Sequence, residues 1–292
     1  MGELDNTLVR MVQLCFATIL FGVPLFSVYG PHEILSRTRQ IVAIACAGMT
    51  AASIAAVILQ TASLTDTSVT IPDVVWYLTD TRIGNIYIFR FVALVGYFSL
   101  VTITPITAVR GKIQGLVGAG LLGSFAWVGH GADSMGHALA DLVHILAAGT
   151  WFGALVALCV LLFKAHRDPA LVVPTARSLE MFSRIGVAVV SVLIASGVTN
   201  ALFAIPLWDG SSLVGSEYGK TVLLKLVILA VMVLLAALNR YKLAPQLTQS
   251  LGGAQSQLPL KYLRQSVLFE TSLAVIVLTL AAHLASTSPP GI

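Results

Sequence analysis

The chain has 292 residues, of which 57% are hydrophobic and only 10% are charged. Soluble domains carry about 25% charged residues, so this composition excludes an ordinary soluble protein and predicts a polytopic membrane protein. The formal net charge of +4 comes from lysines and arginines in short connections, where it reports topology and does not predict nucleic-acid binding. The three cysteines all lie inside apolar runs and none forms a CxxC pair, which argues against a disulfide framework and a cysteine-based metal trap.

Eight apolar segments are long enough to cross a membrane as helices, which takes roughly 20 mostly apolar residues each. They are expected at residues 8–29, 40–62, 85–109, 113–130, 135–163, 178–205, 218–243 and 260–285. The sequence therefore predicts an all-α integral membrane protein, in which residues 1–292 form one transmembrane domain built as an eight-helix bundle.

The connections between these segments alternate between basic and acidic. The basic connections contain Arg37, Arg39, Arg110, Lys112, Lys164, Arg167, Arg177, Arg240, Lys242, Lys261 and Arg264. Because basic loops stay in the cytoplasm, both termini are expected on the outer side of the membrane. The longest outer connection, 63–84, includes a stretch at 74–84 that is predicted to be a short amphipathic piece.

The fifth predicted helix carries a polar stripe in oily surroundings. His137, His144 and Trp151 are seven residues apart, and residues at that spacing return to nearly the same side of a helix. Asp141 lies beside the stripe, four residues after His137 and three before His144. Imidazole and carboxylate groups inside a membrane are costly unless they face a partner, a cavity or an ion. This stripe is therefore the candidate functional site.

Four of the six histidines are expected in the outer half of the bundle. His130 ends the fourth predicted helix and His283 lies near the outer end of the eighth. His137 and His144 are separated by about 10 Å along their helix, too far to bind one ion together, but each can combine with Asp141 or with the other two histidines. Imidazole suits copper, zinc, nickel and iron. The arrangement predicts a shallow and a deeper metal site in series, as at the entrance of a conduction path.

His32 and His166 fall in inner loops and are expected to be solvated. Other polar residues in the helices are expected to line the path or to support it. They are Trp151, Arg90, Lys225, Asn200, Arg184 and Glu270.

A structural interpretation of these residues stays open beside the functional one. Asp141 could form a salt bridge with Lys225 or Arg90, which lie at the same expected depth. Arg184 and Glu270 are most simply an ion pair that joins the sixth and eighth helices in the inner half.

Small residues predict where helices approach closely. Gly149 and Gly153 form a GxxxG pattern on the histidine helix, and the fourth predicted helix carries Gly115, Gly118, Gly120 and Gly123. Such faces permit close packing between helices. The histidine helix is therefore expected to be central in the bundle.

At these residues the chain resembles the copper resistance protein D family, CopD. The resemblance is carried by Gly129 and His130, followed by Asp141, His144, Ala147, Trp151 and Gly153. It continues in SGVTNAL (196–202), in YGKTVLLKL and LAALNRYKLAP (within 218–245), and in LRQSVLFE (263–270) with STSPP (286–290).

The resemblance implies an inner-membrane, multi-pass protein that moves copper from periplasm to cytoplasm, so that both termini would be periplasmic. Members of the family often act beside a small periplasmic copper-binding protein, CopC, which would here be a separate partner. By the same resemblance, His130 and His144 are metal-binding residues; the roles of His137, His283 and Asp141 rest on their expected depth.

The chain is accordingly predicted to bind copper, as Cu(I) or Cu(II), and not to be an enzyme. It contains no ATP-binding motif, so transport would be passive or driven by another gradient. Two alternatives remain open: a b-type haem protein that uses the same histidines as axial ligands, and a proton-coupled carrier of another substrate in which Asp141 and the histidines relay protons.

Overall fold

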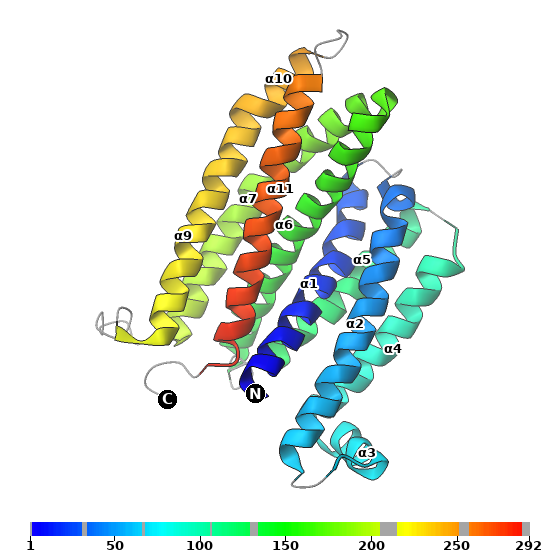
Figure 1. Cartoon of the computed structure of the whole chain (residues 1–292), viewed down its shortest axis with the longest axis vertical. Helices are drawn as coiled ribbons and strands as arrows, with labels where there is room; N and C mark the ends of the chain where they lie inside the picture. The colour runs from blue at the N-terminus through cyan, green and yellow to red at the C-terminus, as the bar shows by residue number, and fades with distance from the viewer. Residues whose placement is uncertain are drawn as a thin grey trace.

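The computed structural model describes residues 2–30, 34–65, 68–105, 107–128, 134–204, 215–250 and 257–287, and every regular element in these ranges is helical. The α-helices are α1 (Gly2–Tyr29), α2 (Ile34–Leu64), α3 (Ile71–Asp80), α4 (Arg82–Thr102), α5 (Ala108–Gly123), α6 (Met135–Arg167), α7 (Val172–Ala204), α9 (Glu217–Leu238), α10 (Ala244–Gln249) and α11 (Gln257–Leu284). Short 3₁₀ turns, η1 (Ser124–Trp127) and η3 (Pro169–Leu171), extend α5 and precede α7, and the π-helical turn η4 (Asn239–Leu243) joins α9 to α10. The long helices run alongside one another as a bundle (Figure 1).

Seven helices in the described ranges are long and apolar enough to cross a membrane: α1, α2, α4, α6, α7, the run from α9 to α10, and α11. The prediction of an all-helical, polytopic membrane protein is confirmed. The fourth predicted segment corresponds to α5, which has only 16 residues and continues into η1. Thr7 Oγ1 lies 3.4 Å from Ser286 Oγ, so α1 begins at the end of the bundle where α11 ends (Figure 1).

The short amphipathic piece predicted near 74–84 is present as α3, at one end of the bundle. Its first turn is fixed by a capping box, in which the Thr70 backbone N–H donates to Asp73 Oδ2 at 2.8 Å. Hydrogen bonds from Thr70 also hold the pKa of Asp73 below its usual value. Tyr77 is buried against the bundle, while Trp76 is exposed. The helix therefore lies against the bundle on one side only.

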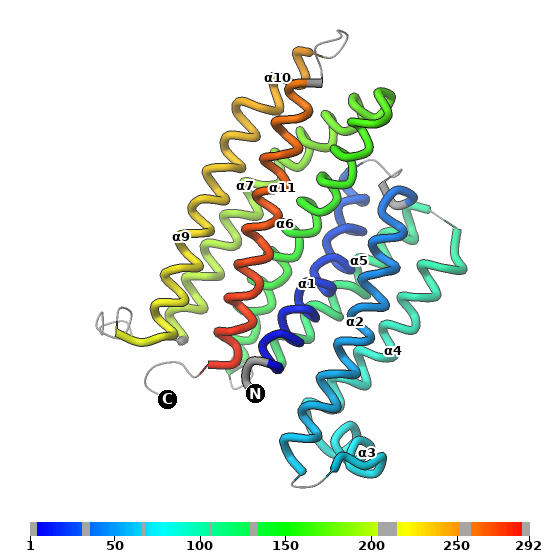
Figure 2. Tube along the Cα trace, in the orientation of Figure 1, coloured from blue at the N-terminus to red at the C-terminus, as the bar shows by residue number. Residues whose placement is uncertain are grey.

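Helix α1 lies inside the bundle, in contact with α2, α5, α6 and α11 (Figure 2). Glycine backbones make two of these contacts unusually close. A Cβ atom added to Gly22 would lie 2.1 Å from the carbonyl oxygen of Gly149 and 2.8 Å from the Cα of Gly153. A Cβ atom on Gly118 would lie 2.5 Å from the carbonyl oxygen of Leu20. The predicted small faces are confirmed: α6 and α5 each pack directly on the α1 backbone.

Helix α6 is likewise central, since it contacts α1, α2, α5, α7 and α11. Its C-terminal half is apolar and buried in the largest hydrophobic cluster of the described residues, which includes Leu155, Leu158 and Leu162 together with Leu263 of α11. The N-terminal half of α6 carries the polar stripe. The glycine contacts with α1 therefore set how that stripe faces the remaining helices.

We expect Gly22→Ala to lower the free energy of unfolding by about 3 kcal/mol, because the new methyl group would collide with the backbone of α6 and force the two helices apart. Thermal unfolding of the detergent-purified protein, followed by size-exclusion chromatography, measures this effect. Gly186→Ala is the matched control: no atom lies within 4 Å of its added Cβ, so the protein should be unchanged or slightly more stable. Equal stability of both variants would contradict the close α1–α6 contact.

Candidate functional site

The polar stripe of α6 faces α7. We call this contact the polar seam; it contains His137, Asp141 and His144 of α6 and Ser196, Asn200 and Phe203 of α7. At the N-terminal end of α6 the ring of His137 stacks on Phe203, with 5.0 Å between the ring centroids and 11° between the planes. One turn further along α6, Asn200 Nδ2 lies 3.4 Å from Asp141 Oδ1. One more turn along, His144 Nδ1 lies 3.0 Å from Ser196 Oγ.

The contact with Ser196 orients the ring of His144. The Ser196 hydroxyl also lies 2.6 Å from the carbonyl oxygen of Val192. When the hydroxyl donates to Val192, His144 Nδ1 is the donor to Ser196 Oγ and Nε2 keeps its lone pair. Gly197 makes room for the ring, because a Cβ atom there would lie 3.3 Å from His144 Cε1. The local sequence Ser-Gly therefore both contacts the imidazole and leaves room for it.

Asp141 makes no ion pair. The salt bridges in the described parts of the chain are Arg184–Glu180 and Lys220–Glu217, both between neighbouring turns of one helix. The carboxylate of Asp141 does interact electrostatically with His137, Lys225 and Arg10. The alternative in which Asp141 forms a salt bridge with Lys225 or Arg90 is thus not found among the described residues, and Arg90 instead donates to Ser124 Oγ at 2.8 Å. Asp141 remains a half-buried carboxylate with one amide donor and cations at longer range.

Two turns inward from His144, a second polar group surrounds Glu270 of α11, which is 1% exposed. Trp151 Nε1 donates to Glu270 Oε1 at 3.0 Å, and Asn239 Nδ2 donates to Glu270 Oε2 at 3.1 Å. Asn239 lies in the π-helical turn η4, a local distortion that is frequent at functional sites. We call these three residues the Glu270 cluster; it places Trp151 in the core.

The predicted ion pair between Arg184 and Glu270 is wrong. Arg184 Nη2 lies 2.6 Å from Glu180 Oε1, and both side chains are largely exposed on α7. The reason is helical spacing: Glu180 is one turn away on the same face, whereas Glu270 points into the core and is satisfied by neutral donors. Arg184 is therefore separate from the polar groups of α6.

The remaining predicted ligands are not gathered at the polar seam. His283 is exposed at the end of α11, where its charge acts on Glu217 of α9. His130 lies outside the described residues. Within the described ranges, no group of three or more histidine, cysteine, aspartate or glutamate side chains is placed so as to hold a metal ion. The seam presents single potential ligands in sequence along α6.

Comparison with known proteins places the chain in a family. It is 31% identical to the copper resistance protein D of Pseudomonas syringae pv. tomato, over an alignment that covers 96% of both chains. The family model described as copper resistance protein D-like, N-terminal domain, matches residues 1–140, and the model described as copper resistance protein D matches residues 176–284. The chain belongs to the copper resistance protein D family.

Two further relatives match parts of this family member. The inner membrane protein YebZ of Escherichia coli (strain K12) is 32% identical over 42% of the chain and 43% of its own length. The copper transport protein CutJ of Bacillus subtilis (strain 168) is 29% identical over 56% of the chain and 31% of its own length. No solved structure matches the chain significantly.

The two family matches flank the part of α6 that carries His144 and Trp151. The N-terminal match ends one residue before Asp141, and the second match contains Ser196, Asn200 and Glu270. His144 and Trp151 lie between the matches and contact Ser196 and Glu270 of the second match. The two matched parts also contact one another directly, through His137 and Phe203 in the seam and through α1 and α11 elsewhere.

Sequence reasoning named Asn200 and Trp151 but missed two other uncharged partners, Ser196 and Asn239. Ser196 stands within the motif SGVTNAL and Asn239 within LAALNRYKLAP, yet neither was distinguished from ordinary helix-packing residues. Serine and asparagine are common at helix contacts in membranes, so their type alone gives little signal. Their roles became clear only from the opposing side chains, His144 for Ser196 and Glu270 for Asn239.

Glu270→Ala should lower the free energy of unfolding by about 2–4 kcal/mol, because it leaves the buried Trp151 and Asn239 donors without acceptors. Thermal unfolding in detergent measures the change. Arg184→Ala serves as the control and should alter stability by less than about 0.5 kcal/mol, since its ion pair is exposed. A larger loss of stability with Arg184→Ala than with Glu270→Ala would contradict this result and support an ion pair between Arg184 and Glu270.

Proposed function

We propose that this protein is an inner-membrane copper carrier that takes copper from the periplasmic side and moves it toward the cytoplasm along α6. Its membership of the copper resistance protein D family supports copper as the cargo, and the name of the Bacillus subtilis relative describes a copper transport protein. The name of the Escherichia coli relative describes an inner membrane protein, which supports that location.

The observation that carries the proposal is the state of His144. Its Nδ1 is held by Ser196, so Nε2 is the nitrogen that would bind copper. Metal-binding histidines usually donate their other ring N–H to a fixed acceptor, which orients the ring and raises its basicity as a ligand. A polar imidazole is costly inside an apolar helix, so an imidazole that is held in a fixed orientation there is better suited to binding an ion than to packing.

The neighbours of His144 would receive and pass on the ion. Outward, Asp141 supplies a carboxylate that is not consumed by an ion pair, and His137 supplies a second imidazole near the entrance. Inward, Glu270 supplies another carboxylate, and Cys159, whose sulfur lies 3.3 Å from Thr271 Oγ1, supplies a soft ligand suited to Cu(I). Because each position offers a single ligand, this arrangement favours movement of the copper ion over tight storage of it.

His130 and His283 would act earlier, at the periplasmic surface. The exposed position of His283 supports a role in capturing copper, either from solution or from a separate CopC-like copper-binding protein. In this proposal α5 with η1 is the eighth crossing, and both termini lie in the periplasm. The hydrogen bond between Thr7 and Ser286, which brings the two ends of the chain to one side, supports an even number of crossings.

No enzymatic step is needed in this mechanism. The residues of the polar seam bind, orient and release the ion, and the surrounding lipid and apolar helices exclude water from it. Carboxylates at Asp141 and Glu270 offset the cost of a cation at membrane depth. The driving force would be the copper gradient or a second ion.

His144→Ala should reduce copper binding to the detergent-purified protein, and copper accumulation by cells that express it, by at least tenfold. Ser196→Ala should produce a smaller loss, because the imidazole remains but its orientation is no longer fixed. His166→Ala is the control: this histidine is exposed near the other end of α6 and should not matter. Copper content by elemental analysis and a visible spectrum are recorded for each protein.

The same measurements separate the alternatives. A Soret band in the wild-type protein that disappears with His144→Ala would show that His144 binds haem and not copper. Unchanged copper binding in His144→Ala, with a loss in His166→Ala, would contradict both the site and the topology. Binding of neither copper nor haem by folded wild-type protein would overturn the proposal.

A further inference from the structure

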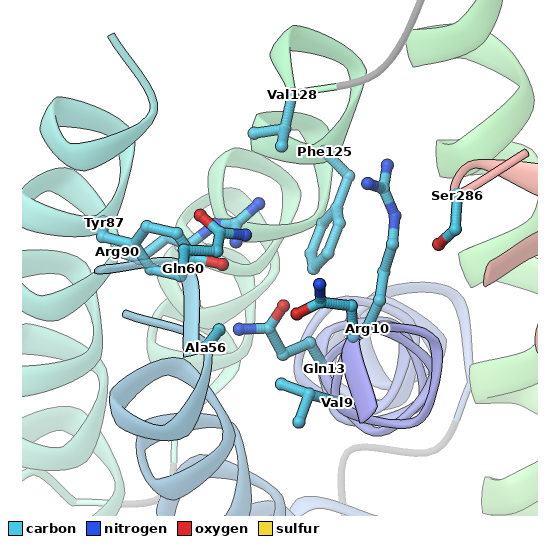
Figure 3. Close-up of a pocket in the computed structure, with 11 residues that line it drawn as sticks. Val9, Arg10, Gln13, Ala56, Gln60, Tyr87, Arg90, Phe125, Val128 and Ser286 are labelled. Atoms are coloured by element: carbon cyan, nitrogen blue, oxygen red, sulfur yellow. The ribbon is translucent and has the colours of Figure 1, made fainter. Parts of the chain in front are cut away.

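A second polar region lies between α1, α2, α4 and η1, in a cavity of about 240 Å³ (Figure 3). We call it the arginine cavity. Its lining residues are Asn6, Val9, Arg10, Gln13, Ala56, Gln60, Tyr87, Arg90, Phe125, Val128 and Ser286. Asn6 and Ser286 are exposed at the end of the bundle where α1 begins and α11 ends, whereas Arg90 is 1% exposed. The cavity therefore connects that end of the bundle with a fully buried guanidinium group.

The Arg90 side chain is fixed in place but not fully satisfied. Its Nε donates to Ser124 Oγ at 2.8 Å, and its guanidinium carbon lies 4.0 Å from the ring centroid of Phe125 and 5.0 Å from that of Tyr87. Its Nη2 is buried and has no hydrogen-bond partner among the described residues, and the same is true of Arg10 Nε. Donors on two arginines are thus available at one cavity.

No described carboxylate lines this cavity, and Asp141 acts on Arg10 only from outside it. None of the described lining residues is an aspartate or glutamate, and neither described salt bridge involves Arg10 or Arg90. The two guanidinium groups also act on each other electrostatically. An unpaired buried ion costs several kcal/mol, and a second like charge adds to that cost. An anion in the cavity would offset both the cost of burying an unpaired charge and the repulsion between the two like charges.

We propose that the arginine cavity binds a phosphate-type oxyanion, either as free inorganic phosphate or as the headgroup phosphate of an anionic lipid. Guanidinium groups bind such oxyanions through paired N–H donors. Gln60 accepts a hydrogen bond from Tyr77 through Oε1, which leaves its amide N–H groups as further donors. The cavity is smaller than the pockets of roughly 300–1,000 Å³ that hold drug-sized molecules, so it fits a phosphate group and not a large ligand.

The test is titration of the purified wild-type protein, in phosphate-free detergent buffer, with inorganic phosphate by isothermal calorimetry and thermal unfolding. Arg10→Gln and Arg90→Gln should weaken phosphate binding at least tenfold and remove the thermal stabilisation that phosphate gives. Arg184→Gln, on the exposed face of α7, is the control and should bind as wild type does. Copper binding at His144 is measured on the same samples and should not change in any of them.

A lipid source is distinguished by native mass spectrometry and by added vesicles. In that case wild-type protein should retain phosphatidylglycerol, and delipidated protein should be restabilised by phosphatidylglycerol vesicles but not by phosphatidylcholine vesicles or inorganic phosphate. If Arg90→Gln fails to fold, the binding by Arg10→Gln and by Gln60→Leu is compared with that of the wild-type protein instead. Absence of both phosphate and phosphatidylglycerol binding in folded wild-type protein, or equal binding in wild type and Arg10→Gln, would overturn the proposal.

Discussion

Direct backbone contact between α1 and α6 orients everything else in this bundle. At Gly22, Gly149 and Gly153 no side chain separates the two helices, so neither can rotate without opening the contact. Each residue of an α-helix advances by about 100°, which puts Gly153 about 180° from His144. Fixing the glycine face on α1 therefore turns the histidine face away from it, toward α7. The same packing that stabilises the bundle selects the helix that the polar groups meet.

Helix α1 consequently separates two polar regions of opposite character. The polar seam and the Glu270 cluster contain carboxylates and imidazoles, as a cation requires, while the arginine cavity contains guanidinium groups and no described carboxylate. Arg10 connects the two regions, because its charge acts on Asp141 as well as on Arg90.

The sequence predicted what depends on composition and helical periodicity. Apolar length located the helices, the seven-residue spacing placed His137, His144 and Trp151 on one face, and the GxxxG pattern identified a close contact. It could not predict partners across helices, because a one-dimensional pattern does not say which faces meet. Charge complementarity therefore paired Arg184 with Glu270, when the actual partners of Glu270 are the neutral Trp151 and Asn239. The arginine cavity escaped notice for the same reason: Arg10 and Arg90 are 80 positions apart in the sequence.

The preference for neutral donors has a consequence for the copper transport that we propose. An arginine or lysine in direct contact with Asp141 or Glu270 would cancel the carboxylate and oppose an entering cation at short range. Amide and indole donors position the same carboxylates without cancelling their charge, since a hydrogen bond leaves the net charge in place. His144 lies between the two carboxylates along α6, held by a hydroxyl group that also carries no charge. Hydrogen bonding thus supplies rigidity while the electrostatic attraction is left for the ion, as a path for a metal cation through a membrane requires.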